Sequence, residues 1–176
     1  PIEVWAHSNC EAVELFVNGR SAGRRPVERN RHVQWSVPYQ PGKLRAVGYV
    51  AGRKAASAER VTAGPAHAVR LDVDRGRISG DGRDLSMLRA EIVDRAGTVV
   101  PYSDALVVFE LAGAGRIIGV GNGNPTSLEP DQASQRHAFN GLCQAIVQSS
   151  GAPGSIRINA TSAGLRSGTV LLVALR

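Results

Sequence analysis

The chain has 176 residues, of which 43% are hydrophobic and 20% charged, which is typical of a soluble globular protein and excludes a disordered one. Its 20 glycines and 9 prolines indicate a turn-rich β fold of one large or two small domains. The net charge of +6 raises the question of nucleic acid, but aromatic stacking partners are scarce and the pattern offers no recognition helix, so we expect no nucleic-acid partner.

Short alternating strands are predicted throughout the first sixty-odd residues. Val13, Leu15 and Val17 share one face of the run 12–17, and Asn18-Gly19 follows at once. Such a pair predicts a type I′ hairpin, because both central positions need a positive φ. The other strands are expected at 3–7, 20–25, 33–37, 43–51 and 54–62. This spacing predicts an Ig-like β-sandwich over residues 1–63.

A second β-sandwich is predicted over residues 68–176, after a short Gly-Pro linker at 64–67. The run 106–111 is more continuously apolar than the others and should form a central strand. The other strands are expected at 68–73, 88–92, 116–120, 144–149, 155–161 and 169–175. No window shows sustained helical spacing. The predicted fold class is therefore all-β, with two tandem Ig-like β-sandwich domains.

One long segment, residues 119–141, reads as neither a strand nor a short turn. It is rich in glycine, asparagine and proline, and such loops are usually functional or held by their own polar contacts. Glu129 and Asp131 are two apart, so in an extended segment they point to opposite sides and could not easily flank one bond. We expect them to cap loop amides or to pair with Arg136.

No catalytic residue, metal site or cofactor is predicted. Asn122, Asn124, Glu129 and Asp131 carry oxygens that Ca²⁺ would accept, but their spacing matches no known calcium loop. The histidines lack metal-ligand spacing, and no serine stands beside a histidine in a usable pattern. Cys10 and Cys143 lie in different predicted domains and are expected to be buried free thiols.

The sequence contains no apolar run long enough to span a bilayer and no visible signal peptide, so we expect no membrane partner. A chain that begins Pro-Ile-Glu-Val looks like an excised piece, and targeting signals would then lie elsewhere.

Seven motifs in this order resemble the C-terminal region of bacterial glycoside hydrolase family 2 enzymes, chiefly β-galactosidases. Two of them, 8–19 and 35–49, are similar to the Ig-like domain that follows the catalytic barrel in that family. The other five are similar to the next domain of the same enzymes: 81–84, 93–97, 100–101, 119–130 and 136–141. One departure is Asn124, where the family more often has Asp; one negative charge fewer weakens any role in metal or sugar binding there.

The resemblance implies that this chain contains no catalytic residues. In the family, the retaining two-glutamate mechanism belongs to a (β/α)₈ barrel that would precede residue 1, and no catalytic residue can be carried onto this sequence. The chain is expected to be a non-catalytic accessory region that packs on and stabilises the barrel of a β-galactosidase. Its partners would be the barrel and preceding domains of the same polypeptide, and the parent is expected to be periplasmic or secreted.

The expected binding or interface residues are Asn122, Asn124, Ser127, Glu129, Arg136, Trp5 and Tyr39. The alternative is a carbohydrate-binding or adhesin-like tandem Ig module, with carbohydrate as the partner and Trp5 and Tyr39 as the stacking surface. Trp35 alternates with valines and is expected in the core, so it is not a candidate.

Overall fold

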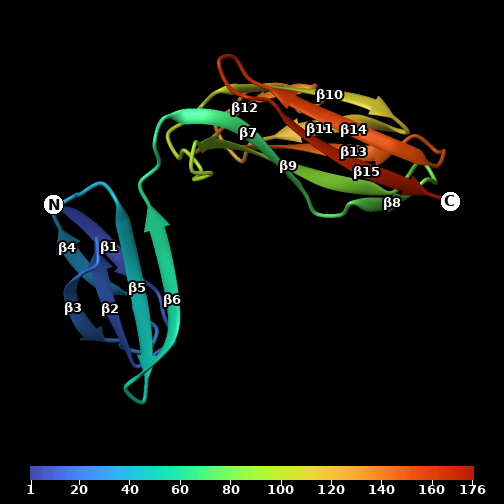
Figure 1. Cartoon of the computed structure of the whole chain (residues 1–176). Helices are drawn as coiled ribbons and strands as arrows, with labels where there is room; N and C mark the ends of the chain where they lie inside the picture. The colour runs from blue at the N-terminus through green and yellow to red at the C-terminus, as the bar shows by residue number, and fades with distance from the viewer. The chain divides into compact units, whose positions relative to one another are not determined.

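The computed structural model describes all 176 residues and contains fifteen β-strands and no helix. The chain divides into two compact units, Pro1–Thr62 and Ala63–Arg176 (Figure 1). No helix is long and apolar enough to cross a membrane. The all-β prediction is therefore confirmed.

The first unit has six strands: β1 (Ile2–Ala6), β2 (Ala12–Val17), β3 (Arg20–Pro26), β4 (Val33–Val37), β5 (Lys43–Val50) and β6 (Arg53–Val61). The second unit has nine: β7 (Ala66–Val73), β8 (Arg77–Ser79), β9 (Leu85–Asp94), β10 (Leu106–Gly113), β11 (Gly115–Gly121), β12 (Gln135–His137), β13 (Leu142–Ser149), β14 (Gly154–Thr161) and β15 (Gly168–Leu175).

A two-stranded sheet, β1-β4, packs against a four-stranded sheet, β3-β2-β5-β6, in the first unit. The predicted hairpin joins β2 to β3, with φ of 50° at Asn18 and 82° at Gly19. The Asn18 side chain also accepts the Lys43 amide at 2.7 Å. Its carbonyl oxygen lies 2.0 Å from where a Cβ on Gly42 would be, and Gly42 has φ of 129°, so only glycine fits there. This turn therefore links the start of β5 to the β2-β3 hairpin.

Trp35 forms the centre of the first core. It is 1% exposed and packs among side chains from both sheets, including Val13 and Leu15. Its indole Nε1 donates to the Gly23 carbonyl at 3.1 Å, so the polar atom of the buried ring is paired. The prediction that Trp35 is a core residue is confirmed.

The second unit packs the five-stranded sheet β12-β10-β14-β15-β8 against the four-stranded sheet β11-β13-β9-β7. Their inward residues form one continuous core, in which Leu88, Ile92, Ile156 and Ile158 are fully buried. Strand β10 lies between β12 and β14, which confirms the expected central position of the run 106–111.

The structure differs from the sequence prediction at the loop, at two short strands and at the linker. The loop expected at 119–141 is shorter, because β11 continues to Gly121 and β12 occupies residues 135–137; the irregular part is 122–134, hereafter the loop. Two strands, β8 and β12, were not predicted, because three residues are too few to show alternation. The expected linker at 64–67 runs into β7, which begins at Ala66.

The Asp94 carboxylate holds the start of the second unit in place through hydrogen bonds to backbone amides. Asp94 accepts hydrogen bonds from the amides of Gly64, Ala96 and Thr98, at 2.8, 2.9 and 2.8 Å. These bonds, the Gly64 amide first, lower the pKa of the Asp94 carboxyl. Gly64 is thereby fixed to the end of β9 and belongs to the second unit.

Both cysteines are buried and free, as predicted. Burial raises the pKa of the Cys143 thiol to about 12. A thiol that stays protonated in the core packs as a small apolar side chain.

The two tryptophans provide a matched test of the first core. Trp35→Ala should cost about 3–5 kcal/mol because it leaves a large cavity and an unpaired Gly23 carbonyl. Trp5→Ala should change stability by no more than about 0.5 kcal/mol, since Trp5 is 56% exposed. Urea unfolding followed by circular dichroism measures both, and equal midpoints for the two variants would contradict the assignment.

Candidate functional site

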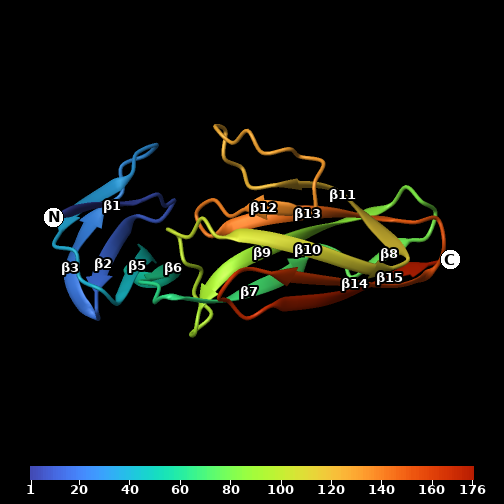
Figure 2. The ribbon, with the colours of Figure 1, turned by 90° about the horizontal axis from the view of Figure 1, so that it is seen from above.

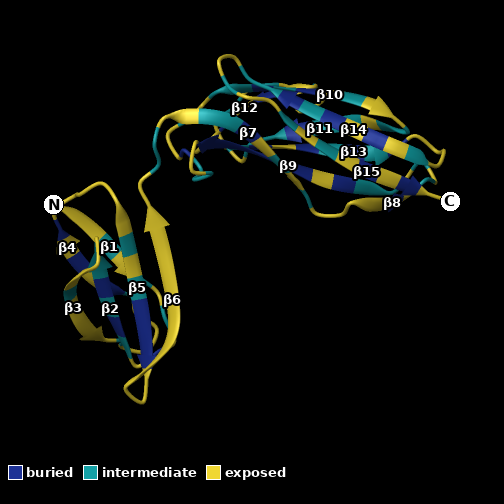
Figure 3. Cartoon of the chain, viewed as in Figure 1, coloured by how far each residue is buried: buried dark blue, intermediate teal, exposed yellow.

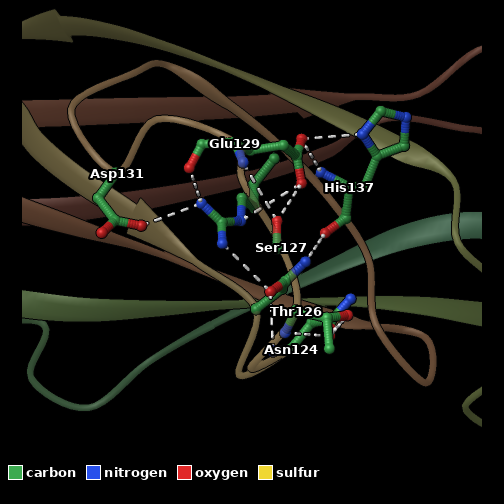
Figure 4. Close-up of polar contacts among 8 residues, drawn as sticks. Asn124, Thr126, Ser127, Glu129, Asp131 and His137 are labelled. Atoms are coloured by element: carbon green, nitrogen blue, oxygen red, sulfur yellow. Dashed lines mark hydrogen bonds and ion pairs between the residues drawn. The ribbon is translucent and has the colours of Figure 1, made fainter.

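The densest group of polar side chains surrounds the guanidinium of Arg136, on β12 (Figure 4). Arg136 is 4% exposed. Its Nη1 donates to the Glu129 carbonyl at 3.1 Å and to the Asp131 carboxylate at 3.0 Å, and its Nη2 donates to Asn122 Oδ1 at 3.4 Å. Its Nε lies 3.5 Å from Glu129 Oε2, as an ion pair without a hydrogen bond. One buried cation thus holds the loop at three points.

Glu129 joins the loop to the neighbouring strand. Its Oε1 accepts the His137 amide at 3.2 Å and lies 2.9 Å from His137 Nδ1. Its Oε2 accepts the Ser127 hydroxyl at 3.2 Å. The contact with the His137 ring is the main cause that lowers the pKa of the Glu129 carboxyl. The charged form of Glu129 is therefore the form that the fold stabilises.

The two asparagines form consecutive turns at the start of the loop. Asn122 Nδ2 donates to the His137 carbonyl at 2.9 Å, and Asn122 Oδ1 accepts the Asn124 amide at 3.0 Å. Asn124 Oδ1 accepts both the amide and the hydroxyl of Thr126, at 3.0 and 2.9 Å. This turn needs only a side-chain oxygen as acceptor, so Asn124 forms it as well as an aspartate would.

The seven residues predicted from the sequence fall into two groups. Five come together around Arg136: Asn122, Asn124, Ser127, Glu129 and Arg136 itself. Trp5 and Tyr39 belong to the first unit. Trp5 stacks on His32 with a centroid distance of 4.1 Å, and Tyr39 is 60% exposed. The prediction that Glu129 and Asp131 pair with Arg136 or cap loop amides is confirmed.

Leu128 is the residue that the sequence prediction missed. Its side chain is 98% exposed, although its neighbours Ser127 and Glu129 are tied into the Arg136 contacts. The sequence did contain a signal for an exposed apolar residue, because Leu128 lies between two prolines in an otherwise polar loop. Figure 2 shows the connection between β11 and β12 standing clear of the sheets. The polar contacts therefore hold in place a loop that presents an apolar side chain to solvent.

The other carboxylates with perturbed pKa values serve turns or neighbouring side chains. Asp81 accepts the amides of Arg83 and Asp84, and Asp84 accepts the Ser79 amide. These bonds lower the pKa of both carboxyls. A general acid of a glycosidase needs the opposite, a raised pKa. No three His, Cys, Asp or Glu side chains gather as a metal site would require.

The lowered pKa of Glu129 gives a testable pH dependence. The ionised Glu129 stabilises the folded state fully at pH values above 4.5, the ordinary pKa of a glutamate side chain. This stabilisation is lost as the pH falls through the lower pKa that Glu129 has in the folded state. Glu129→Gln should therefore destabilise the second unit by about 1 kcal/mol at neutral pH, and the difference from the wild type should shrink in acid. Thermal unfolding at a series of pH values measures this, with Glu110→Gln, at an exposed position on β10, as the control. The pairing would be contradicted if both variants responded to pH alike.

Comparison with known proteins places this geometry in context. Residues 69–171 match the glycoside hydrolase family 2 C-terminal domain 5, and residues 1–56 match a domain of unknown function, DUF4982. The chain is 39% identical over 175 residues to Beta-galactosidase BoGH2A of Bacteroides ovatus, covering 98% of this chain and 21% of that protein. It is 33% identical to a putative beta-glucuronidase of Formosa agariphila, covering 70% of this chain and 12% of that protein.

A solved glycosyl hydrolase family 2 member from Bacteroides cellulosilyticus superposes with a TM-score of 0.94 at 35% identity. That match covers 99% of this chain and 23% of the solved one. The chain thus spans about a fifth of the length of the first relatives that it matches. From the family match over more than half of its residues, the chain belongs to the glycoside hydrolase family 2 C-terminal domain 5 family.

Proposed function

We propose that this chain is the non-catalytic accessory region of a longer family 2 glycosidase, and that the parent hydrolyses β-galactosides. The observation that carries the proposal is the match of 98% of this chain to 21% of a β-galactosidase. The carboxylates agree with it, because the perturbed ones are held ionised by turn amides, side-chain hydroxyls or ion pairs. The hydrolytic step would then take place in the part of the polypeptide outside these residues. A periplasmic or secreted location for the parent stays a prediction.

The loop is the proposed contact with the rest of that polypeptide. Its backbone is fixed by Arg136 and by the two asparagine turns, so docking would cost little conformational entropy. Leu128 is the apolar anchor that the loop offers, and burying a leucine contributes about 1.5–3 kcal/mol. The predicted polar residues would therefore act by holding the loop, and Leu128 by making the contact.

A carbohydrate-binding module is the second candidate, and one observation favours it. Trp5 is 56% exposed and already oriented by its stack on His32, as a sugar-binding aromatic would be. Because Trp35 is buried, a saturable fluorescence change on adding galactose or a β-galactoside would report on Trp5. A fluorescence change of this kind that is absent in Trp5→Ala would favour the carbohydrate-binding function over the accessory one.

Leu128→Asp tests the interface in the longer polypeptide. In the 176-residue chain this substitution should change the unfolding free energy by less than about 0.5 kcal/mol, because the side chain is exposed. In the longer polypeptide it should lower stability by about 2 kcal/mol or more, since an apolar contact is lost and a charge is buried.

The matched control is Leu171→Asp, an exposed leucine on β15 of the same unit. Thermal unfolding and turnover of a chromogenic β-galactoside would be measured for both variants. Equal behaviour of the two variants in the longer polypeptide would contradict the role of Leu128.

A further inference from the structure

The two sheets of the first unit are unequal in width. The sheet β1-β4 has two strands, and the sheet packed against it, β3-β2-β5-β6, has four. The core between them draws its side chains from β1 to β5. No side chain of β6 takes part in it. One strand of the wider sheet is therefore left without a facing partner.

The register of β6 shows that its uncovered side is the inward one. Ala58 pairs with Ala46, and Ala56 pairs with Gly48. Directly paired residues point to the same side of a sheet, and Ala46 packs on the core. Ala56 and Ala58 therefore point inward, yet every residue of β6 is exposed (Figure 3, yellow). Small apolar side chains on the inner side of a sandwich are thus open to water.

A groove separates β6 from β1 at this side of the unit. It has a volume of about 320 Å³, and its lining includes Val4 and Ala6 of β1, Leu15 of β2, Leu44 of β5, and Ala56 and Ala58 of β6. Strand β1 pairs with β4 alone, so the N–H and C=O groups of its other edge face this groove without a strand partner. The groove combines an apolar floor with a free hydrogen-bonding edge.

We propose that this groove, the open groove hereafter, binds one extended segment of the same longer polypeptide as an added strand beside β1. The segment would pair with the free edge of β1 and lay alternate apolar side chains over Ala56 and Ala58. The proposal rests on the proposed function in one respect, namely that the chain is part of a longer polypeptide.

The order of strands supports an added strand at this position. Ig-type sandwiches place strands A, B, E and D in one sheet and C, F and G in the other. Strands β1 and β4 occupy the B and E positions, and β2, β5 and β6 occupy C, F and G. Of the two unfilled positions, A and D, it is A that lies beside β1 and opposite β6. An occupant there would give β6 its missing partner.

A second copy of the chain fits this groove poorly. Pairing β1 with β1 of another copy would bring the two projecting β6 strands into the same space, because each four-stranded sheet extends beyond its two-stranded partner on this side. A segment of the same polypeptide meets no such obstacle. It also acts at an effective concentration on the order of millimolar, which favours it over a separate molecule.

Hydrogen exchange on the longer polypeptide tests the proposal. The amides of β1 that point away from β4 should be protected at least about 10-fold relative to the same amides in the 176-residue chain. Ala58→Glu in the longer polypeptide should abolish that protection by placing a charge under the added strand. Ala55→Glu is the matched control, because Ala55 is an exposed alanine of the same strand that does not line the open groove.

Unprotected β1 edge amides in the longer polypeptide would overturn the proposal, as would equal effects of the two variants. A dimer in sedimentation that dissociates in Ala58→Glu would also overturn it, in favour of a second copy. The readout is independent of turnover. Protection of β1 in a polypeptide that hydrolyses no glycoside would sustain the added strand and refute the proposed function alone.

Discussion

The loop of the second unit depends on one buried cation, Arg136. Moving a guanidinium out of water is costly unless its charge is paired, so Arg136 requires anionic and polar partners at the position where β12 places it. The loop supplies them, through a backbone carbonyl, two carboxylates and an amide oxygen. Because these partners come from both ends of the loop, the contacts of Arg136 help to fix an irregular segment that lies outside the strands.

Several carboxylates of the second unit hold loops and turns in place. Glu129 and Asp131 serve Arg136, and Asp94 serves the amides that begin the second unit. The contacts of Glu129 and Asp94 favour the ionised carboxylate, whereas acid catalysis requires a protonated one. A region whose carboxylates hold loops and boundaries in place is suited to present rigid surfaces to other parts of a polypeptide. We propose Leu128 and the open groove as two such surfaces.

Much of the fold follows from local pattern, and the parts that do not have physical causes. Alternation located the longer strands, and Asn18-Gly19 fixed the first hairpin, because both signals are local. Strand β12 was missed because its one buried residue is the charged Arg136, which alternation does not identify as an inward position. Arg136 and the four loop residues around it were found from composition, but the exposure of Leu128 depends on contacts in the folded structure that its local sequence does not show. The exposure of the inner side of β6 could not be predicted from residues 53–61, because it depends on whether another strand lies opposite them.

The most direct test of the account compares turnover by the 176-residue chain with turnover by the longer polypeptide, on a chromogenic β-galactoside. The account predicts hydrolysis by the longer polypeptide and none by the 176-residue chain at the same molar concentration. Hydrolysis by the 176-residue chain itself would contradict it, because a catalytic pair of carboxyl groups would then have to lie within these residues.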